Sequence, residues 1–188
     1  SDAVRMMSEG ELLQIEKARR LDIDESVYYD IIERKTASLI ATCCAVGANC
    51  GGGSEEEVDR MRQFGTRLGI AFQIKDDLFD YQVVNRSGKP SGIDIKEQKM
   101  TLPLIHALAQ SKASQRRKII RTIKKDHRDP KKVAEVVDFV NSSGGIAYAE
   151  EAMKRYRDEA IELLMHFEES PVRNALEALV HYVIERKK

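Results

Sequence analysis

The sequence predicts an all-α fold, a bundle of helices, on three observations. Apolar residues recur at three- and four-residue steps along most of the chain, which is the spacing of one helix face. The helix-breaking residues, 4 prolines and 11 glycines, are few and gather in clusters. No stretch shows the alternation of apolar and polar residues that is typical of a strand. We expect the 188 residues to form a single helical domain over residues 1–188.

The composition excludes several classes of protein. The 31 basic and 31 acidic side chains balance, which argues against a wholly basic nucleic-acid binder. No apolar run reaches the length of a membrane span, and no signal segment opens the chain. The 3 cysteines, with Cys43 and Cys44 adjacent, suit a buried, reduced interior better than a disulfide framework and lack zinc-site spacing. We therefore expect a cytoplasmic location.

Apolar spacing and turn residues place three helices in the first half of the chain. An opening helix runs to about Leu21, and a second is expected from about Asp24 to Gly47. Three glycines at 51–53 form a turn, and Ser54 before three glutamates is typical of a helix N-terminus. The third helix is expected to continue to about Val84.

The second half holds one long polar loop and five further helices. The loop is expected over Asn85–Met100, and loops of this length are usually functional. The helices are expected at about 102–111, 114–127, 131–142, 145–168 and 171–186.

The third helix carries the most informative group of side chains, Gln73, Asp76, Asp77 and Asp80. At 100° per residue they fall within an arc of about 100°, spread over about 10 Å of helix axis. The rest of the helix is apolar, so we expect it to be central. Two carboxylates one turn apart repel by about 2–3 kcal/mol at an effective dielectric constant of about 20. A bound divalent cation relieves that cost.

An all-oxygen ligand set favours Mg²⁺, which commonly bridges carboxylates to substrate phosphates. Lys75 points to another face of the helix and cannot neutralise the aspartates. The alternative is an acidic surface patch on an ordinary helix. Gly65 and Gly69, on the same stripe, provide either close helix packing or room for a substrate.

The segment Phe64–Tyr81 (FGTRLGIAFQIKDDLFDY) resembles the second aspartate-rich motif of the trans-isoprenyl diphosphate synthases, an all-α family. The resemblance continues in register along nearly the whole chain. Within the family, the sequence most resembles the bacterial octaprenyl and other long-chain polyprenyl synthases. Its further segments are Glu9–Gln14, the pair Lys35-Thr36, Gly88–Leu108, Ser142–Leu164 and Leu176–Lys188.

Two departures from the family pattern matter. Gln98 stands where the family usually has glycine before the lysine of the loop. Nothing in residues 1–63 matches the family's first DDxxD motif, the arginine pair that follows that motif, or the family's isopentenyl diphosphate residues. We therefore expect the C-terminal part of a synthase, an isoprenoid-synthase bundle truncated at its N-terminal side. By itself it is predicted to be inactive.

The resemblance implies a Mg²⁺-dependent prenyltransferase that joins isopentenyl diphosphate to an allylic prenyl diphosphate, and a homodimer. It also assigns roles to the matching residues. Asp76, Asp77 and Asp80 hold metal; Lys35, Lys89 and Lys99 contact the allylic diphosphate; Thr36 and Gln73 lie near the carbocation; and Phe72 lies against the isopentenyl group. Without the resemblance, the sequence favours a snorkelling surface charge for Lys35 and solvated charges for Lys89 and Lys99. Asp94 either fixes the loop or reaches a metal.

Other functions compete with this interpretation. A carboxylate-bridged redox metal bundle needs a Glu-x-x-His spacing, but Glu162–His166 and Glu177–His181 are one residue too long. A non-catalytic partner subunit or binding module stays open, and predicts that Asp76 or Asp80 tolerates asparagine.

The stretch Lys112–Lys132 holds ten Lys or Arg and two Asp. It could contact an anionic membrane surface or nucleic acid, or form a solvated helix face. The stretch has no aromatic residue to stack on bases, so we expect no nucleic-acid partner. Apolar helix faces left uncovered by a truncation predict self-association.

Overall fold

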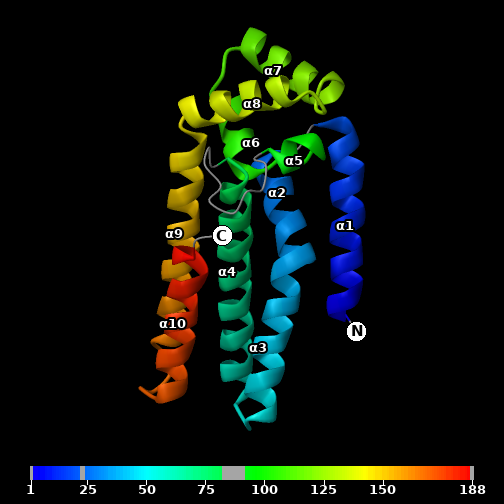
Figure 1. Cartoon of the computed structure of the whole chain (residues 1–188). Helices are drawn as coiled ribbons and strands as arrows, with labels where there is room; N and C mark the ends of the chain where they lie inside the picture. Colours follow the sequence, from blue (N-terminus) through cyan, green and yellow to red (C-terminus); the bar gives the residue numbers. More distant parts are fainter. Residues whose placement is uncertain (1, 22–23, 82–91, 187–188) are drawn as a thin grey trace. The chain divides into compact units, whose positions relative to one another are not determined.

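The computed structural model describes residues 2–21, 24–81 and 92–186, and every regular element within these ranges is a helix (Figure 1). The all-α prediction is confirmed. The elements in chain order are α1 (Asp2–Arg20), α2 (Glu25–Ile32), η1 (Glu33–Ala37), α3 (Ser38–Cys50), α4 (Glu55–Phe79), α5 (Ile93–Lys96), α6 (Leu102–Ala109), α7 (Ala113–Lys125), α8 (Pro130–Ser142), α9 (Gly145–Leu164) and α10 (Pro171–Glu185).

Contacts within the chain separate two compact units. Unit 1 consists of Ser1–Leu12, Tyr29–Lys75 and Ala152–Lys187, and the main segments of unit 2 are Leu13–Tyr28 and Asp76–Glu151. Four helices, α1, α2, α4 and α9, contribute residues to both units. That residues 1–188 form one domain stays a prediction.

Glycines on α4 set the close packing of α3 and α4 in unit 1. A Cβ atom added at Gly65 would lie 2.6 Å from the Cα atom of Ala41, and one at Gly69 would lie 2.5 Å from that of Ala37. Real Cβ atoms do not approach a backbone so closely, so the two helices pack this tightly because the side chains are missing. Of the two interpretations of these glycines, the structure supports close helix packing.

The second helix of the sequence prediction is a longer and less regular run. It ends at Cys50 rather than Gly47, and a π-helical turn, η1, interrupts it between α2 and α3. A π turn inserts a residue into the helical repeat and often marks a functional site. In this chain it contains Lys35 and Thr36.

In unit 2, α4 ends at Phe79, five residues before the predicted end at Val84. Beyond Phe79 the α-helical hydrogen bonds give way to shorter-range ones. The Asp80 and Tyr81 N–H groups donate to the carbonyl oxygens of Asp77 and Leu78, three residues back, which closes the helix. The polar loop predicted over Asn85–Met100 contains the short helix α5, and residues 82–91 lie outside the described residues. The fully buried core of this unit includes Tyr81, Phe79, Ile95, Leu102, Leu104, Ile123, Val136 and Val140.

Two local predictions have opposite outcomes. Ser54 and Glu57 form a capping box at the start of α4, with the Ser54 N–H donating to Glu57 Oε2 at 2.7 Å and the Glu57 N–H to Ser54 Oγ at 3.3 Å. The cysteines are less buried than predicted, because Cys43 and Cys50 are exposed and Cys44 is half-buried.

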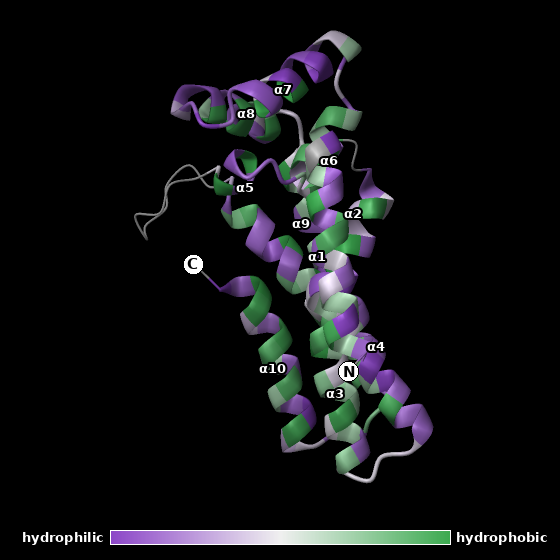
Figure 2. Cartoon of the chain, turned by 90° about the vertical axis from the view of Figure 1, so that its right-hand side faces the viewer, coloured by the Kyte–Doolittle hydropathy of each residue, from purple (hydrophilic) through white to green (hydrophobic). Residues whose placement is uncertain are grey.

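The helices are amphipathic, and green hydrophobic residues interrupt purple hydrophilic ones along α4 and α10 in Figure 2. Among the helices in the described ranges, none combines the length and the apolar content needed to cross a bilayer.

Candidate diphosphate and metal site

The predicted site residues divide between the two units. Lys35, Thr36, Phe72 and Gln73 lie in unit 1, whereas Asp76, Asp77, Asp80 and Lys99 lie in unit 2. Lys89 lies outside the described residues. The helix α4 carries Phe72, Gln73, Asp76 and Asp77, and Asp80 directly follows its last residue.

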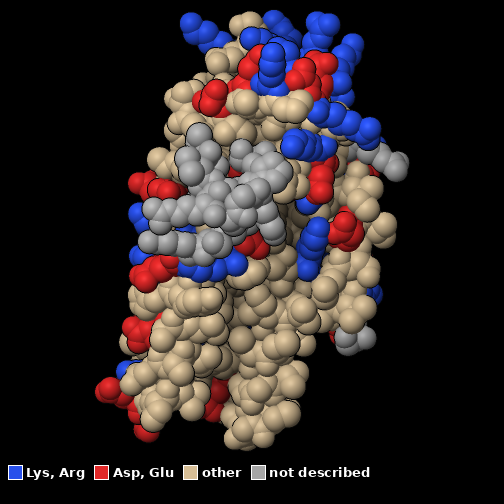
Figure 3. Space-filling view, viewed as in Figure 1, with Lys and Arg blue, Asp and Glu red and all other residues tan. Residues whose placement is uncertain are grey.

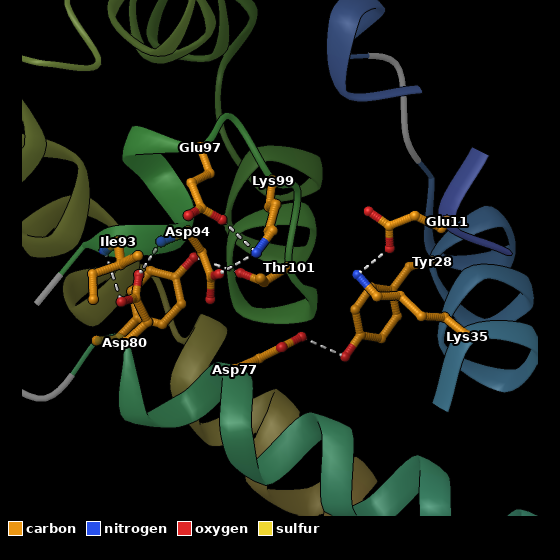
Figure 4. Close-up of polar contacts among 11 residues, drawn as sticks. Glu11, Tyr28, Lys35, Asp77, Asp80, Ile93, Asp94, Glu97, Lys99 and Thr101 are labelled. Carbon is orange, nitrogen blue, oxygen red and sulfur yellow. Dashed lines mark hydrogen bonds and ion pairs between the residues drawn. The ribbon is translucent and has the colours of Figure 1, made fainter. Parts of the chain in front are cut away.

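The aspartates at the end of α4 are largely buried. Asp77 and Asp80 are 6% and 5% exposed, and Asp76 is half-buried. The Tyr28 hydroxyl donates a hydrogen bond of 2.7 Å to Asp77 Oδ2 (Figure 4). A hydrogen bond to the ionised form helps a carboxylate to stay charged when it is removed from water.

Asp80 connects the end of α4 to the start of α5. Its Oδ1 accepts the Ile93 N–H at 2.8 Å, its Oδ2 accepts the Asp94 N–H at 3.0 Å, and its carbonyl oxygen accepts the Gly92 N–H at 2.9 Å. The side chain therefore occupies the N-terminus of α5 as a capping carboxylate does. An ionised carboxylate has about four lone-pair positions, so hydrogen bonds to both of its oxygens are compatible with a further bond to a cation.

Lys99 is held by acidic side chains of the same segment. Its Nζ atom lies 2.5 Å from Glu97 Oε2 and 3.5 Å from Asp94 Oδ1 (Figure 4). Burial lowers the pKa of Lys99, but these two carboxylates outweigh it, so the pKa is raised and the ammonium group stays charged. Of the two roles considered for Asp94, these contacts favour fixing the loop.

The pKa values of Asp94 and Tyr81 show the effect of the negative charge concentrated in unit 2. Burial raises the pKa of Asp94, the charge of Asp80 adds to the rise, and Lys99 opposes it. Burial also raises the pKa of Tyr81 well above its usual value, and Asp80, Asp94 and Asp77 add to that rise, against the lowering effect of a 2.6 Å hydrogen bond with Thr101. A cation placed near these carboxylates would be stabilised by the same charges.

In unit 1, the π turn η1 brings Lys35 and Thr36 to two different partners. The Nζ atom of Lys35 lies 2.6 Å from Glu11 Oε2 (Figure 4), and the Thr36 hydroxyl donates to Gln73 Oε1 at 2.9 Å. A Cβ atom added at Gly10 would lie 2.8 Å from the Lys35 backbone nitrogen, so this glycine allows α1 to approach η1 closely. Thr36 and Gln73, which the resemblance assigns to the same part of the site, are therefore in direct contact.

Phe72, one residue before Gln73 on α4, is half-buried and covered by a cation. The guanidinium carbon of Arg186 lies 4.3 Å from the centre of the Phe72 ring, close enough for a cation–π interaction.

The carboxylates do not form a finished metal cage. In the ranges that the structure describes, no three His, Cys, Asp or Glu side chains gather closely enough to hold an ion by themselves. Mg²⁺ is compatible with such a site, because it commonly takes one or two carboxylates and completes its shell with waters and substrate phosphates. The all-oxygen donors Asp76, Asp77 and Asp80 fit that kind of binding.

Comparison with known proteins identifies the family. Residues 1–140 match the family model described as polyprenyl synthetase. The chain belongs to the polyprenyl synthetase family. It is 36% identical over 187 residues to a short chain isoprenyl diphosphate synthase of Methanothermobacter thermautotrophicus, covering 99% of the chain and 57% of that relative. The corresponding values for an octaprenyl diphosphate synthase of Escherichia coli are 34% over 190 residues, 99% and 58%.

A solved structure supports the same assignment of the fold. The chain superposes on a polyprenyl synthase from Caulobacter crescentus, determined with calcium and isoprenyl diphosphate, with a TM-score of 0.91 and 31% identity, covering 100% of the chain and 57% of that protein. The predicted isoprenoid-synthase fold is confirmed. The chain spans somewhat more than half the length of these relatives.

Several residues in the site have roles that the sequence did not indicate. Tyr28 donates to Asp77, Glu11 pairs with Lys35, and Glu97 pairs with Lys99. Glu11 lies in the segment Glu9–Gln14 that resembles the family, so a signal for it existed. Tyr28 is 49 residues from Asp77 and has no local signal.

Proposed function

We propose that the chain forms the part of a trans-prenyl diphosphate synthase that holds the diphosphate of an allylic substrate through Mg²⁺. The observation that carries the proposal is the pair of buried aspartates, Asp77 and Asp80, at the end of an apolar helix in a chain of this family. Burial of two acids so close together is costly unless a cation and hydrogen bonds compensate it.

The reaction proposed for the whole synthase begins with cleavage of the bond between the allylic carbon and the diphosphate oxygen. The bonding electrons leave with the diphosphate, and the remaining allylic cation is attacked by the double bond of isopentenyl diphosphate, which then loses a proton. Mg²⁺ bound to the diphosphate supplies neutralisation of the charge that develops on the leaving group. In this chain, Asp76, Asp77 and Asp80 would supply the carboxylate oxygens that hold it.

The lysines would bind the same diphosphate as point charges. Lys35 and Lys99 each end in a charged ammonium group already held in place by a carboxylate. Phosphate oxygens carry more negative charge than a single carboxylate oxygen and accept stronger hydrogen bonds from such groups. Lys89 is proposed for the same role on the resemblance of its segment to the family.

The pair Thr36–Gln73 would serve the cationic side of the reaction. The Thr36 hydroxyl donates to Gln73 Oε1 and thereby fixes the orientation of both side chains. Oxygen atoms with lone pairs stabilise a nearby positive charge when their dipoles are oriented in advance. The role of Phe72 beside the isopentenyl group stays a proposal based on resemblance.

Calorimetric titration of the chain with an allylic diphosphate, with and without Mg²⁺, tests this function. We expect binding that depends on Mg²⁺ and that weakens at least tenfold in Asp76→Asn, because a carboxylate ligand is lost. Asp76 is half-buried, so this exchange disturbs the fold less than one at Asp77 or Asp80.

Asp59→Asn, an exposed exchange on the same helix, is the matched control and should bind like the unmodified chain. Binding that survives Asp76→Asn would contradict the proposal and favour a non-catalytic partner subunit. Unchanged circular dichroism of both variants confirms that they are folded.

Three further predictions accompany the proposal. The chain by itself is expected to form no elongated product, and product formation by the pure chain would refute this.

Self-association is expected, since unit 1 exposes apolar side chains at Val4, Leu12, Leu39, Val46, Val172 and Leu179. A monomer in solution scattering at high concentration would contradict it. The cytoplasmic location stays a prediction.

A further inference from the structure

The helix α7 of unit 2 has one buried side and one strongly basic side. Ile119, Thr122 and Ile123 are 7%, 8% and 0% exposed, and α7 packs on α8. These buried residues fix which side of the helix faces water. The 13 residues of α7 make a straight rod about 20 Å long.

The exposed side is rich in basic residues and carries no acidic one. The segment from Lys112 to Lys125 contains no acidic residue and holds seven cations, all exposed: Lys112, Arg116, Arg117, Lys118, Arg121, Lys124 and Lys125. Lys and Arg side chains gather over α7 in Figure 3, and Figure 2 colours most of this helix as hydrophilic.

The charge of the chain is therefore unevenly distributed. Because the whole chain holds 31 basic and 31 acidic side chains, the 174 residues outside this segment hold 24 against 31, a net charge of −7. Within the described part of the chain, no acidic side chain lies within 4.0 Å of an α7 cation to form an ion pair. A concentrated, uncompensated positive face creates a field that attracts polyanionic surfaces.

The shape and chemistry of this face favour a lipid surface over nucleic acid. The segment Lys112–Lys132 has no Phe, Tyr or Trp to stack on bases. No large apolar side chain of α7 is exposed, so the contact would be electrostatic and would not need insertion into the acyl chains. A cluster of exposed cations along one helix matches the many anionic headgroups of a flat membrane surface.

We propose that α7 docks the chain on an anionic phospholipid surface, with its basic side against the headgroups. This inference stands on the charge and exposure of α7 and does not depend on the proposed function. If that function also holds, docking would place the source of an apolar product beside the bilayer that dissolves it.

Co-sedimentation of the chain with vesicles tests the proposal. The vesicles contain phosphatidylcholine with phosphatidylglycerol in a two-to-one ratio, and pure phosphatidylcholine is the neutral reference. We expect binding to the anionic vesicles and little to the neutral ones. Raising the ionic strength from about 0.1 M to about 1 M shortens the Debye length from about 10 Å to about 3 Å and should abolish the binding.

The variant Arg117→Gln/Arg121→Gln/Lys124→Gln removes three cations from one face of α7. Each cation at an anionic surface is worth about a fivefold gain in partitioning, so we expect about a hundredfold loss. The control Arg20→Gln/Arg62→Gln/Lys154→Gln changes the net charge equally at exposed positions on other helices, and should bind like the unmodified chain.

Three results would overturn the proposal: equal binding to neutral vesicles, equal loss in the control variant, or no vesicle binding at low salt. A further arm measures binding to a DNA duplex by fluorescence anisotropy. Duplex binding tighter than vesicle binding, and lost in the same α7 variant, would assign the face to nucleic acid instead.

Discussion

The anionic and cationic groups of the candidate site are held by different kinds of partner. In unit 2, Asp77 and Asp80 accept hydrogen bonds from neutral donors, the Tyr28 hydroxyl and the backbone N–H groups that open α5. The lysines are held by acids, Lys35 by Glu11 and Lys99 by Glu97 and Asp94. A cation that approaches the aspartates shares lone pairs with neutral donors. An anion that approaches the lysines competes with carboxylates.

This difference gives the two halves different sensitivities. The aspartate half depends on local geometry, because Asp80 both caps α5 and is a predicted metal ligand. The lysine half depends on an exchange of partners and on the close packing that brings Thr36 to Gln73. Substitutions can therefore break the hydrogen-bond geometry around the aspartates or alter the exchange of partners at the lysines.

The largest effect is expected for Gly69→Ala in unit 1. The new Cβ atom would lie 2.5 Å from the Cα atom of Ala37, the last residue of η1, so the junction of η1 and α3 must separate from α4 beside Thr36. Overpacking of this kind lowers the free energy of unfolding by about 1–3 kcal/mol. Because the clash is with backbone, which cannot move aside as a side chain can, we expect a loss of about 3 kcal/mol for this variant. Urea unfolding measures the change.

Gly47→Ala is the matched control on α3. Nothing lies within 4 Å of the added Cβ atom, so we expect no loss and a gain of up to about 1 kcal/mol from better helix propensity. Equal effects of the two alanines would show that α3 and α4 are not closely packed.

A smaller loss is expected for Asp80→Ala in unit 2. The Ile93 and Asp94 N–H groups lose their acceptor, and loss of a capping oxygen lowers the free energy of unfolding by up to about 2 kcal/mol. Hydrogen exchange at these two amides should become much faster. Asp80→Asn keeps one acceptor oxygen, so its effects should lie between those of the unmodified chain and Asp80→Ala. Asp138→Ala, an exposed exchange on α8, should change neither the free energy of unfolding nor the exchange rate of these amides. Unaltered exchange in Asp80→Ala would remove the capping role.

The smallest effect is expected for Glu11→Gln, and it concerns binding. Lys35 loses the charge of its partner and becomes available to an anion, so we expect diphosphate to bind about twofold to fivefold more tightly, as for a partly exposed ion pair of up to about 1 kcal/mol. Glu9→Gln, which disturbs Arg34 instead, is the control. Weaker binding in Glu11→Gln would mean that Glu11 positions Lys35 rather than competing for it.

The sequence predicted the groups on single helices better than the contacts between helices. Helical spacing alone places Gln73, Asp76 and Asp77 on one face of α4, with Asp80 directly after the helix, and the Ser54 capping box is equally local. The Thr36–Gln73 hydrogen bond spans 37 residues, so no local spacing predicts it, and the resemblance to a family only assigned both residues to one part of the site.

The remaining features depend on tertiary structure. A π turn hardly disturbs the three- and four-residue spacing of apolar residues. The sequence of η1 therefore cannot be told from that of an ordinary α-helix. The end of α4 was misplaced because apolar residues continue to Val84 while Asp80 turns to cap α5. Neither Tyr28 nor Glu97 belongs to a pattern that announces its partner.

A crystal structure of the chain with Mn²⁺ in place of Mg²⁺ and with an allylic diphosphate tests the central claim most directly. Anomalous scattering locates the metal. We predict a Mn²⁺ ion bound by Asp76 or Asp77 and the diphosphate, with Lys35 and Lys99 turned from Glu11 and Glu97 to phosphate oxygens. Diphosphate bound with both ion pairs intact, or metal bound away from the aspartates, would contradict the account.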